Sequence, residues 1–246
     1  MSKLAICFYG QPRFLDNQIV RSCYSDIIEK YNADVYVHSW ISESPIVEPL
    51  LTSSWVPTIY ETSNAASKIL EWLKPKRFKF DPPILVTEKL SSKSINLAKD
   101  MELYNSKNEL TMLSHLKSVK ESVNLIDTPS EYDFILVTRF DVMLEVFPTL
   151  SNMDSNKFYI RWQPNSPWWY DAAQLCGSKF YKSFYTFDNI DSIVEYLHNT
   201  DRRFYPELFK QRQHTLAGHD EDSVVYTNDL NYAIVRSHDG LTNVLR

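Results

Sequence analysis

The stretch FILVTRFDVM, residues 134–143, decides the fold class of this chain. Its four leading apolar or β-branched residues predict a strand covered on both faces, because a half-exposed strand would alternate apolar and polar residues. Arg139 and Asp141 follow on one face, where this strand is expected to end. Open α/β sheets bind ligands at the carboxyl ends of their strands, so an acid and a base here suit a metal-bound diphosphate. The alternative is that Asp141 is a strand-terminating turn residue paired with Arg139 on the surface.

Length and composition predict one α/β domain over residues 1–246. The chain has 246 residues and 43% hydrophobic content, enough to bury one large core. The net charge is −5 and basic residues form no stripe, which argues against a nucleic-acid partner. A short apolar amino terminus and the lack of any run of about 18 apolar residues argue against a signal peptide and a transmembrane segment. We therefore expect a soluble, cytoplasmic protein.

Cysteines and glycines exclude several kinds of site. Cys7, Cys23 and Cys176 are odd in number and show no CxxC spacing, so we expect reduced thiols, buried in the first and last case, and no zinc site. Only four glycines occur in the chain, whereas a GxGxxG fingerprint or a Walker A loop needs several close together. A Rossmann NAD site and a P-loop are thereby excluded.

The first forty residues predict a βαβ unit. An apolar strand over 4–9 is ended by Gly10-Gln11-Pro12-Arg13, residues 14–31 have apolar residues at helical spacing, and residues 34–40 form a second strand. Such a unit starts a parallel sheet. The further expected elements are strands at 59–60 and 78–80, a helix over 65–73, a surface loop over 81–94, an amphipathic helix through 110–126 and a strand over 232–235.

Three motifs, taken together, resemble a known family. They are YGQPR at 9–13, HSW at 38–40 and RFD at 139–141. Their order resembles that in the GT-A-fold glycosyltransferases of viruses, phages and bacterial polysaccharide clusters, which pair a YGQPR first strand with an HxW second strand and a DxD-like RFD. The resemblance runs from Leu4 to about Val235. It implies a single GT-A domain, a Rossmann-like, mixed and mostly parallel sheet flanked by helices.

The resemblance also implies an activity. It is the transfer of a hexosyl or pentosyl group from a nucleotide-diphosphate sugar, such as a UDP- or GDP-sugar, to a hydroxyl of a glycan acceptor. The cofactor would be Mn²⁺ or Mg²⁺, and the family includes virus-encoded enzymes of glycan biosynthesis that act in the host cytoplasm. Arg139 stands where a full DxD has its first acid, so Asp141 is the one carboxylate ligand that this motif offers. Either the metal has fewer protein ligands or Arg139 neutralises part of the charge.

The predicted metal ligands are Asp141 and His238. One aspartate is sufficient in principle, because the diphosphate and water complete the octahedron of a hard cation. A further ligand in many such folds comes from near the carboxy terminus, where SHDG at 237–240 offers His238 or Asp239. The alternative is a solvated loop histidine.

The predicted donor loop is Gly10-Gln11-Pro12-Arg13, at the carboxyl edge of the first strand. Arg13 can fork onto a phosphate with several donors at once. A tight βα turn is the alternative, which explains the glycine and the proline but not the arginine. His38 and Trp40 end a neighbouring strand and either line the same crevice or, for Trp40, pack in the core. The predicted donor-binding residues are Phe8, Tyr9, Gly10, Arg13, Arg139 and Asp141.

The acidic segment HDED at 219–222 supplies the predicted catalytic residues. In the GT-A pattern that it resembles, a Glu-Asp pair at a helix start often faces the acceptor, where an inverting enzyme needs a general base. Glu221 and Asp222 are therefore the candidates, with Asp222 preferred. Acids at a helix start are also stabilised by the helix dipole without any catalytic duty. A metal cluster in HDED is disfavoured, because adjacent side chains point in different directions.

An aromatic segment supplies the predicted acceptor site, because aromatic faces commonly grip the CH face of a pyranose. Its residues are Trp162, Trp168, Trp169, Tyr170 and Asp171, and the acceptor-binding prediction falls on Trp168, Trp169 and Asp171. The alternative is an aromatic cluster of the core.

Two other functions remain open at this stage. A nucleotidyltransferase that makes nucleotide sugars has a similar layout, but it normally needs a glycine-rich phosphate loop, and Gly10 is single. A non-catalytic carbohydrate-binding protein is supported by the incomplete DxD at Arg139.

Overall fold

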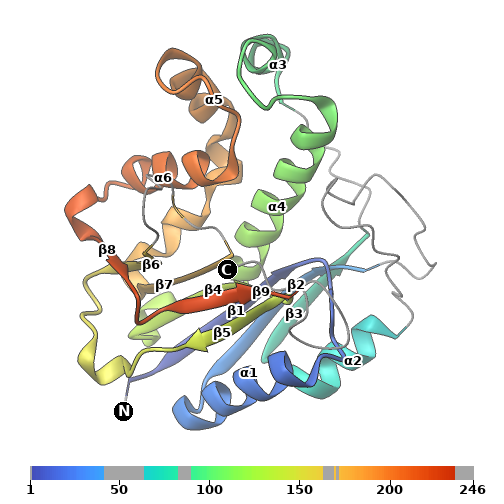
Figure 1. Cartoon of the computed structure of the whole chain (residues 1–246), viewed down its shortest axis with the longest axis vertical. Coiled ribbons are helices and arrows are strands. Elements are labelled where there is room, and N and C mark those ends of the chain that lie inside the picture. The colour runs from blue at the N-terminus through green and yellow to red at the C-terminus, as the bar shows by residue number, and fades with distance from the viewer. Residues whose placement is uncertain (1, 42–63, 83–89, 163–168, 170–171, 236–246) are drawn as a thin grey trace.

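A seven-stranded sheet forms the centre of the protein in this computed structural model, which describes residues 2–41, 64–82, 90–162, 169 and 172–235. The strand order is β3-β2-β1-β4-β7-β6-β8 (Figure 1). The strands are β1 Leu4–Gly10, β2 Asp34–Trp40, β3 Arg77–Asp81, β4 Phe134–Arg139, β6 Phe158–Arg161, β7 Ala173–Gly177 and β8 Val224–Thr227. A separate two-stranded sheet pairs β5, Val142–Val146, with β9, Asn231–Ile234.

The sheet is mixed and mostly parallel, as the sequence predicts. The strands β3, β2, β1 and β4 run parallel to one another. The strand β7 is antiparallel to both β4 and β6, and β8 is parallel to β6. The carboxyl ends of six strands therefore lie at one edge, which we call the carboxyl edge.

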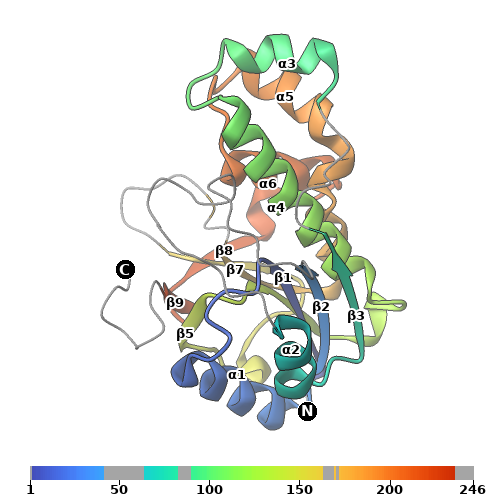
Figure 2. The ribbon, with the colours of Figure 1, turned by 90° about the vertical axis from the view of Figure 1, so that its right-hand side faces the viewer.

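Helices cover both faces of the sheet (Figures 1 and 2). The helices α1, Gln18–Tyr31, and α2, Ala65–Leu73, lie on one face, and α4, Ser106–Asn124, and α6, Pro206–Leu216, lie on the other. The shorter helices α3, Ser92–Lys99, and α5, Ile190–Asn199, pack on each other beside the far end of α4. One-turn to two-turn 3₁₀ helices occur at Pro129–Glu131, Leu150–Asn152, Ser178–Phe184, Thr186–Asn189 and Glu221–Ser223. No helix within the described ranges has the length and apolar character that crossing a bilayer requires.

The apolar run of β1 is continuous because both of its faces are covered. Its even-numbered residues from Leu4 to Phe8 pack toward α1 and α2, and its odd-numbered residues from Ala5 to Tyr9 pack toward α4. Cys7 and Cys176 lie in this core as free, buried thiols, as predicted, and burial raises the pKa of both. Cys23 is also free.

A third hydrophobic cluster defines a helical lobe. The lobe is formed by α3, α5, the start of α6 and the amino-terminal half of α4, which we call its far half because it lies away from the sheet. Its buried residues are Trp40, Leu90, Ala98, Met101, Met112, Leu113, Leu116, Ile193, Val194, Leu197, Phe204, Leu208 and Phe209. Trp40 reaches it from the end of β2, so the packed alternative for this tryptophan is confirmed.

Two helix boundaries differ from the sequence pattern. The helix expected from residue 14 begins at Gln18, because the Asn17 side chain caps it by accepting hydrogen bonds from the Ile19 and Val20 amides. The helix expected through 110–126 is present as α4 but begins earlier, at Ser106, and a separate short helix, α3, precedes it. Between them Leu103 has φ of 67° and Glu102 is hydrogen bonded on both sides to the 202–204 segment. That break depends on distant residues, so no glycine or proline marks it. The expected strand at 59–60 lies outside the described residues.

The prediction that a helix starts at HDED is wrong. Glu221–Ser223 forms a single 3₁₀ turn, and the next residues are strand β8. The β-branched and aromatic composition of Val224–Thr227 favours a strand, and pairing with β6 provides one. Glu221 and Asp222 therefore do not lie at the start of an α-helix.

Candidate functional site

The three motifs of the sequence meet at the carboxyl edge. Tyr9 of β1 pairs with Arg139 of β4, and Gly10 pairs with Ser39 of β2. The loops that follow these strands therefore leave the sheet side by side, as expected for neighbouring parallel strands. This arrangement places Arg13 and Asp141 together.

Asp141 lies between two arginines, a cluster that we call the arginine clamp (Arg13, Arg139 and Asp141). The Arg139 guanidinium donates from Nε to Oδ1 at 2.8 Å and from Nη2 to Oδ2 at 2.7 Å. Arg13 Nη1 lies 3.6 Å from the same Oδ2. Asp141 is only 1% exposed, whereas the arginine side chains are 18% and 20% exposed. The Arg139–Asp141 pair, which the alternative interpretation of the sequence places on the surface, is thus buried at its acidic end and reaches solvent at its basic end.

The donor loop is held in a compact form by Arg13 itself. Its Nε and Nη2 donate to Gln11 Oε1 at 3.0 and 2.7 Å. Gly10 has φ of +96°, a conformation that favours glycine, although a Cβ there would meet no atom within 4 Å. The positive φ of the turn therefore accounts for the glycine. The ion pair with Asp141 accounts for the arginine.

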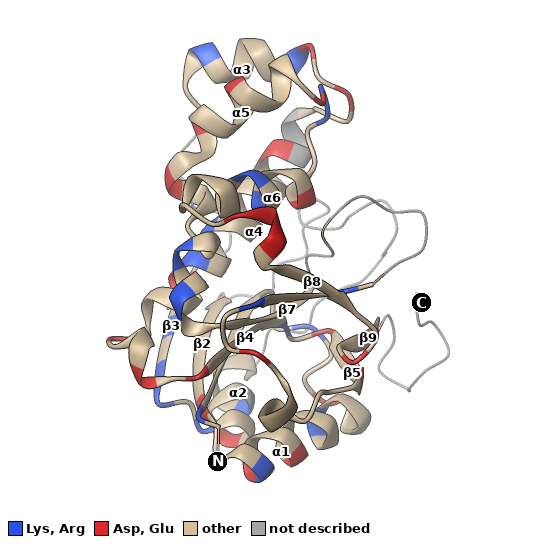
Figure 3. Cartoon of the chain, turned by 90° about the vertical axis from the view of Figure 1, so that its left-hand side faces the viewer, with Lys and Arg blue, Asp and Glu red and all other residues tan. Residues whose placement is uncertain are grey.

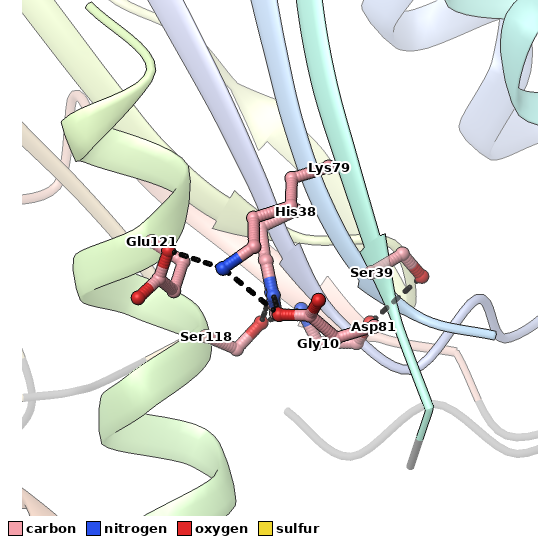
Figure 4. A network of polar contacts seen from close by, with 7 residues as sticks. All are labelled: Gly10, His38, Ser39, Lys79, Asp81, Ser118 and Glu121. Atoms are coloured by element: carbon pink, nitrogen blue, oxygen red, sulfur yellow. Dashed lines mark hydrogen bonds and ion pairs between the residues drawn. The ribbon is translucent and has the colours of Figure 1, made fainter.

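A buried polar network stands behind Gly10 (Figure 4). The Gly10 amide donates to Ser118 Oγ at 2.7 Å, and Ser39 Oγ donates to the Gly10 carbonyl at 2.9 Å. Ser118 Oγ also lies 2.7 Å from Nδ1 of His38, which is fully buried. The network continues through Asp81, Lys79 and Glu121, with His38 Nε2 to Asp81 at 3.1 Å, Lys79 to Asp81 at 3.1 Å and Lys79 to Glu121 at 2.8 Å. We call these seven residues the Gly10 network.

Two pKa shifts describe the charge state of the network. Burial lowers the pKa of His38, and the nearby Asp81 only partly offsets this effect. For Asp81, burial raises the pKa, but hydrogen bonds from His38 and Lys79 outweigh burial, so its pKa is lowered overall. The network thus favours a neutral imidazole beside an ionised carboxylate.

Two predicted donor-binding side chains lie in the core. Phe8 is fully buried, stacks on Phe140 at 5.4 Å between ring centroids and meets Tyr24 edge-on at 4.8 Å. Tyr9 is 1% exposed and points to the opposite face, with the Lys210 ammonium 5.6 Å from its ring centroid. Strand alternation under helices on both faces accounts for this burial. Neither ring is exposed to a ligand at the carboxyl edge.

The acceptor prediction also changes at Trp169. This residue is 2% exposed and packs against Phe158 and His214, with ring centroids 5.2 and 5.1 Å away. A ring covered by protein offers no face to a sugar, so for Trp169 the core alternative holds. Trp162 is 47% exposed. The other predicted residues of this kind and the predicted carboxy-terminal ligands, Trp168, Tyr170, Asp171, His238 and Asp239, lie outside the described residues.

The structure does not bring Glu221 and Asp222 to the donor loop. They precede Val224, whose register partners lead across the sheet through Phe158, Cys176 and Ile135 to Ala5. That row is near the amino-terminal end of β1, four strands away. Strand spacings put the acids roughly 25 Å from Gly10. Figure 3 shows the acidic turn at the start of β8, beside α6.

The described residues do not fit a metal ion as they are arranged. Within the described ranges, no group of three His, Cys, Asp or Glu side chains is positioned to hold one. Both Asp141 oxygens accept hydrogen bonds from Arg139, so a cation bound there would lie beside the positive charge of the Arg139 guanidinium, which opposes its binding.

The sequence analysis missed Ser118, Asp81 and Glu121. A signal was present on α4, where Ser114, Ser118 and Ser122 recur every four residues next to the apolar positions and all three are buried. Buried hydroxyls need hydrogen-bond partners, so such a row predicts polar contacts beneath the helix.

Comparison with known proteins supports the fold. No protein-family model and no curated protein sequence matches the chain. Among solved structures, core-mannan synthase A from Aspergillus fumigatus in its Mn/GDP form has a TM-score of 0.53 and 8% identity, covering 94% of this chain and 74% of its own. The mannosyltransferase Ktr4p from S. cerevisiae has a TM-score of 0.48 and 9% identity, covering 94% of this chain and 69% of its own.

The galactosyltransferase LgtC, in complex with donor and acceptor sugar analogs, has a TM-score of 0.46 and 12% identity, covering 92% of this chain and 73% of its own. The TM-scores of Ktr4p and LgtC are too low to carry an argument, so the comparison rests on the mannan synthase. At 8% identity it is informative about the fold alone. The mixed sheet with its flanking helices is the fold of the GT-A glycosyltransferases.

Proposed function

We propose that the protein is a glycosyltransferase that uses a nucleotide-diphosphate sugar as donor. The observation that carries this proposal is the arginine clamp at the carboxyl edge of the sheet. Two guanidiniums face one carboxylate there, which leaves one positive charge in excess among the three side chains. Guanidinium groups match the geometry of phosphate oxygens, and this edge is where open α/β sheets bind ligands.

The clamp has a chemical role in sugar transfer. When the bond between the anomeric carbon and the diphosphate breaks, negative charge grows on the departing oxygen. Preorganised cations stabilise that charge in the transition state more than in the ground state, which lowers the barrier. Asp141 fixes the Arg139 guanidinium before the donor arrives, so little reorganisation is needed. The acceptor would be a hydroxyl of a glycan, and the transferred group a hexosyl or pentosyl unit.

Metal dependence is a separate part of the proposal. The mannan synthase structure is a Mn/GDP form, and Mn²⁺ or Mg²⁺ bound by Asp141 and His238 is the prediction from sequence for this chain. The bidentate hold of Arg139 on Asp141 does not favour that ligand set, so no catalytic step is assigned to a metal here.

The same bidentate pair favours a second candidate, a non-catalytic protein that binds nucleotide sugars or carbohydrates. One experiment separates the two. Binding of UDP and GDP is measured by calorimetry, and release of nucleoside diphosphate from UDP- and GDP-sugars is measured with and without a glycan mixture, each in Mn²⁺ and in EDTA.

Release that rises with the acceptor supports the glycosyltransferase. Binding without release supports the second candidate. If neither nucleotide binds and no sugar nucleotide is consumed, the glycosyltransferase and a non-catalytic protein that binds nucleotide sugars are both wrong. Equal donor affinity in Mn²⁺ and in EDTA would overturn the metal prediction alone.

A further inference from the structure

Gly10 is held by side chains from two other elements. Its amide donates to Ser118 of α4 and its carbonyl accepts from Ser39 of β2, at 2.7 and 2.9 Å. Figure 4 shows that these contacts come from opposite sides of the chain just where β1 ends. Because φ is positive at Gly10, this residue sets the direction in which the donor loop leaves the sheet.

The hydrogen bonds of the Gly10 network have a fixed direction. The Asp81 carboxylate accepts, so His38 must donate from Nε2, and a neutral imidazole then accepts at Nδ1. Ser118 therefore donates its hydroxyl proton to Nδ1, which leaves its oxygen to accept from the Gly10 amide. The hydrogen bonds thus all point the same way, with each group donating to the next from Gly10 through Ser118 and His38 to Asp81.

Charged groups secure the outer end of this relay. Lys79 lies 3.1 Å from Asp81 and 2.8 Å from Glu121, so the carboxylate that accepts the hydrogen bond from His38 is itself held by an ion pair that links β3 to α4. These are the charged side chains that act on His38, and they keep Asp81 ionised and in place. The imidazole ring is further fixed by Trp40, which meets it edge-on at 4.9 Å.

We propose that His38 and Ser118 are positioning residues, which hold Gly10 so that the donor loop presents Arg13 to the nucleotide-sugar donor. The inference rests on the proposed function and assigns a role in donor binding to a buried network that itself touches no donor. Arg13 follows Gly10 by three residues, and a rotation at Gly10 would move its guanidinium away from Asp141. Misplacement of a binding group by about 1 Å is enough to weaken positioning strongly.

The test compares two serine variants of the same helix. Ser118→Ala and Ser122→Ala each remove one buried hydroxyl from α4, one turn apart, but Ser122 Oγ donates to the Val119 carbonyl of its own helix. We expect Ser118→Ala to raise the dissociation constant of the donor nucleotide about tenfold, the value of one hydrogen bond of ordinary strength. Ser122→Ala should leave donor affinity unchanged, although it should lower the melting temperature by about as much as Ser118→Ala does.

A second pair of variants keeps the inference testable if Ser118→Ala fails to fold. The side-chain amide of asparagine in His38→Asn would lie near the position of Nδ1 in the wild-type ring. That of glutamine in His38→Gln would lie near the position of Nε2. His38→Asn can still accept from Ser118, so it should keep more donor affinity than His38→Gln at similar thermal stability. A positioning role should also raise the KM for donor more than it lowers kcat.

Equal donor affinity of Ser118→Ala and Ser122→Ala, or better binding by His38→Gln than by His38→Asn, would overturn the positioning role. A wild-type protein that binds no nucleotide at all would instead overturn the proposed function, and the inference with it. The two failures are therefore distinguished by the wild-type titration.

Discussion

Arg139 holds both carboxylate oxygens of Asp141, through Nε at 2.8 Å and Nη2 at 2.7 Å, although only one residue separates them in the chain. The RFD motif thereby folds back on itself at the end of β4. The Arg13 guanidinium from the donor loop approaches the same carboxylate at 3.6 Å. Three charged side chains from two distant motifs thus form one unit, and the predictions below begin with it.

Asp141→Ala should lower the free energy of unfolding by about 2–3 kcal/mol, because it leaves two partly buried guanidiniums without their shared carboxylate. Urea denaturation measures this change. Asp16→Ala is the control, since Asp16 pairs with Lys68 on the surface and exposed pairs contribute about 0–1 kcal/mol. Equal effects of the two substitutions would show that the clamp carries no special stability.

Arg13→Lys should weaken binding of UDP or GDP about tenfold, since lysine keeps the charge but loses the planar fork. Lysine also cannot reach Gln11 and Asp141 at the same time, as Arg13 does. Calorimetric titration measures the affinity. The control is Arg77→Lys, because Arg77 pairs with Asp127 on the surface far from the clamp. An unchanged affinity in Arg13→Lys would remove Arg13 from the donor site.

His214 predicts a pH dependence of stability. Burial, with a smaller contribution from the charge of His219, lowers its pKa from 6.5 to about 4. The unfolded chain therefore binds the proton more tightly, and stability is lost as pH falls from 6.5 towards 4. A shift of this size corresponds to roughly 3 kcal/mol.

The measurement is the urea midpoint between pH 4 and 7 for the wild type and His214→Gln. In the wild type, the imidazole lies 2.9 Å from Ser183 Oγ and 2.8 Å from Ser223 Oγ. The variant should show a flatter profile across this window. Parallel profiles for the two proteins would mean that another group causes the acid sensitivity.

Glu221→Gln and Asp222→Asn, made separately, test the general base predicted from sequence. A lost base costs about 10²–10⁴ in rate while donor binding is spared. The register places both acids at the other edge of the sheet, so we expect each variant to retain turnover. A hundredfold loss with normal donor affinity would instead place the acceptor hydroxyl beside β8.

The central strands could be predicted because their signals are local. The apolar runs over β1 and β4 and the helical spacing of α1 each lie within one short segment, and the parallel pairing of β1 with β2 follows from the βαβ rule. The insertion of antiparallel β7 between β4 and β6 could not be predicted. Its residues, AQLCG, carry no strand pattern of their own, and pairing with two distant strands decides their conformation.

The same division applies to the site. The rule that ligands bind at the carboxyl ends of strands brought Arg13 and Asp141 together from sequence alone. Burial was harder to predict, because an aromatic side chain suits a sugar platform and a core equally well, and Phe8 and Trp169 belong to the core. Ser118 was missed because its function depends on His38, which lies on a strand of another part of the chain.

Helix α4 belongs to two cores at once. Val119 and Val123 pack against the sheet, while Met112, Leu113 and Leu116 belong to the helical lobe. The lobe also needs Ile193 and Val194 of α5, which the chain reaches only after β4, β6 and β7. Because β4 is made before α5, the strands β1, β2 and β4 are available for pairing before the lobe can close, so we expect the lobe to form after them during synthesis.

Limited proteolysis of nascent chains stalled after β7 and after α5 would show this order, with α4 cut in the shorter chain and protected in the longer one. Equal protection in the two chains would contradict it. On the ribosome, α3 and the far half of α4 emerge well before their partner α5. Their apolar faces must therefore remain uncovered while β4, β5, β6 and β7 are synthesised, and this interval is when the nascent chain is most exposed to aggregation.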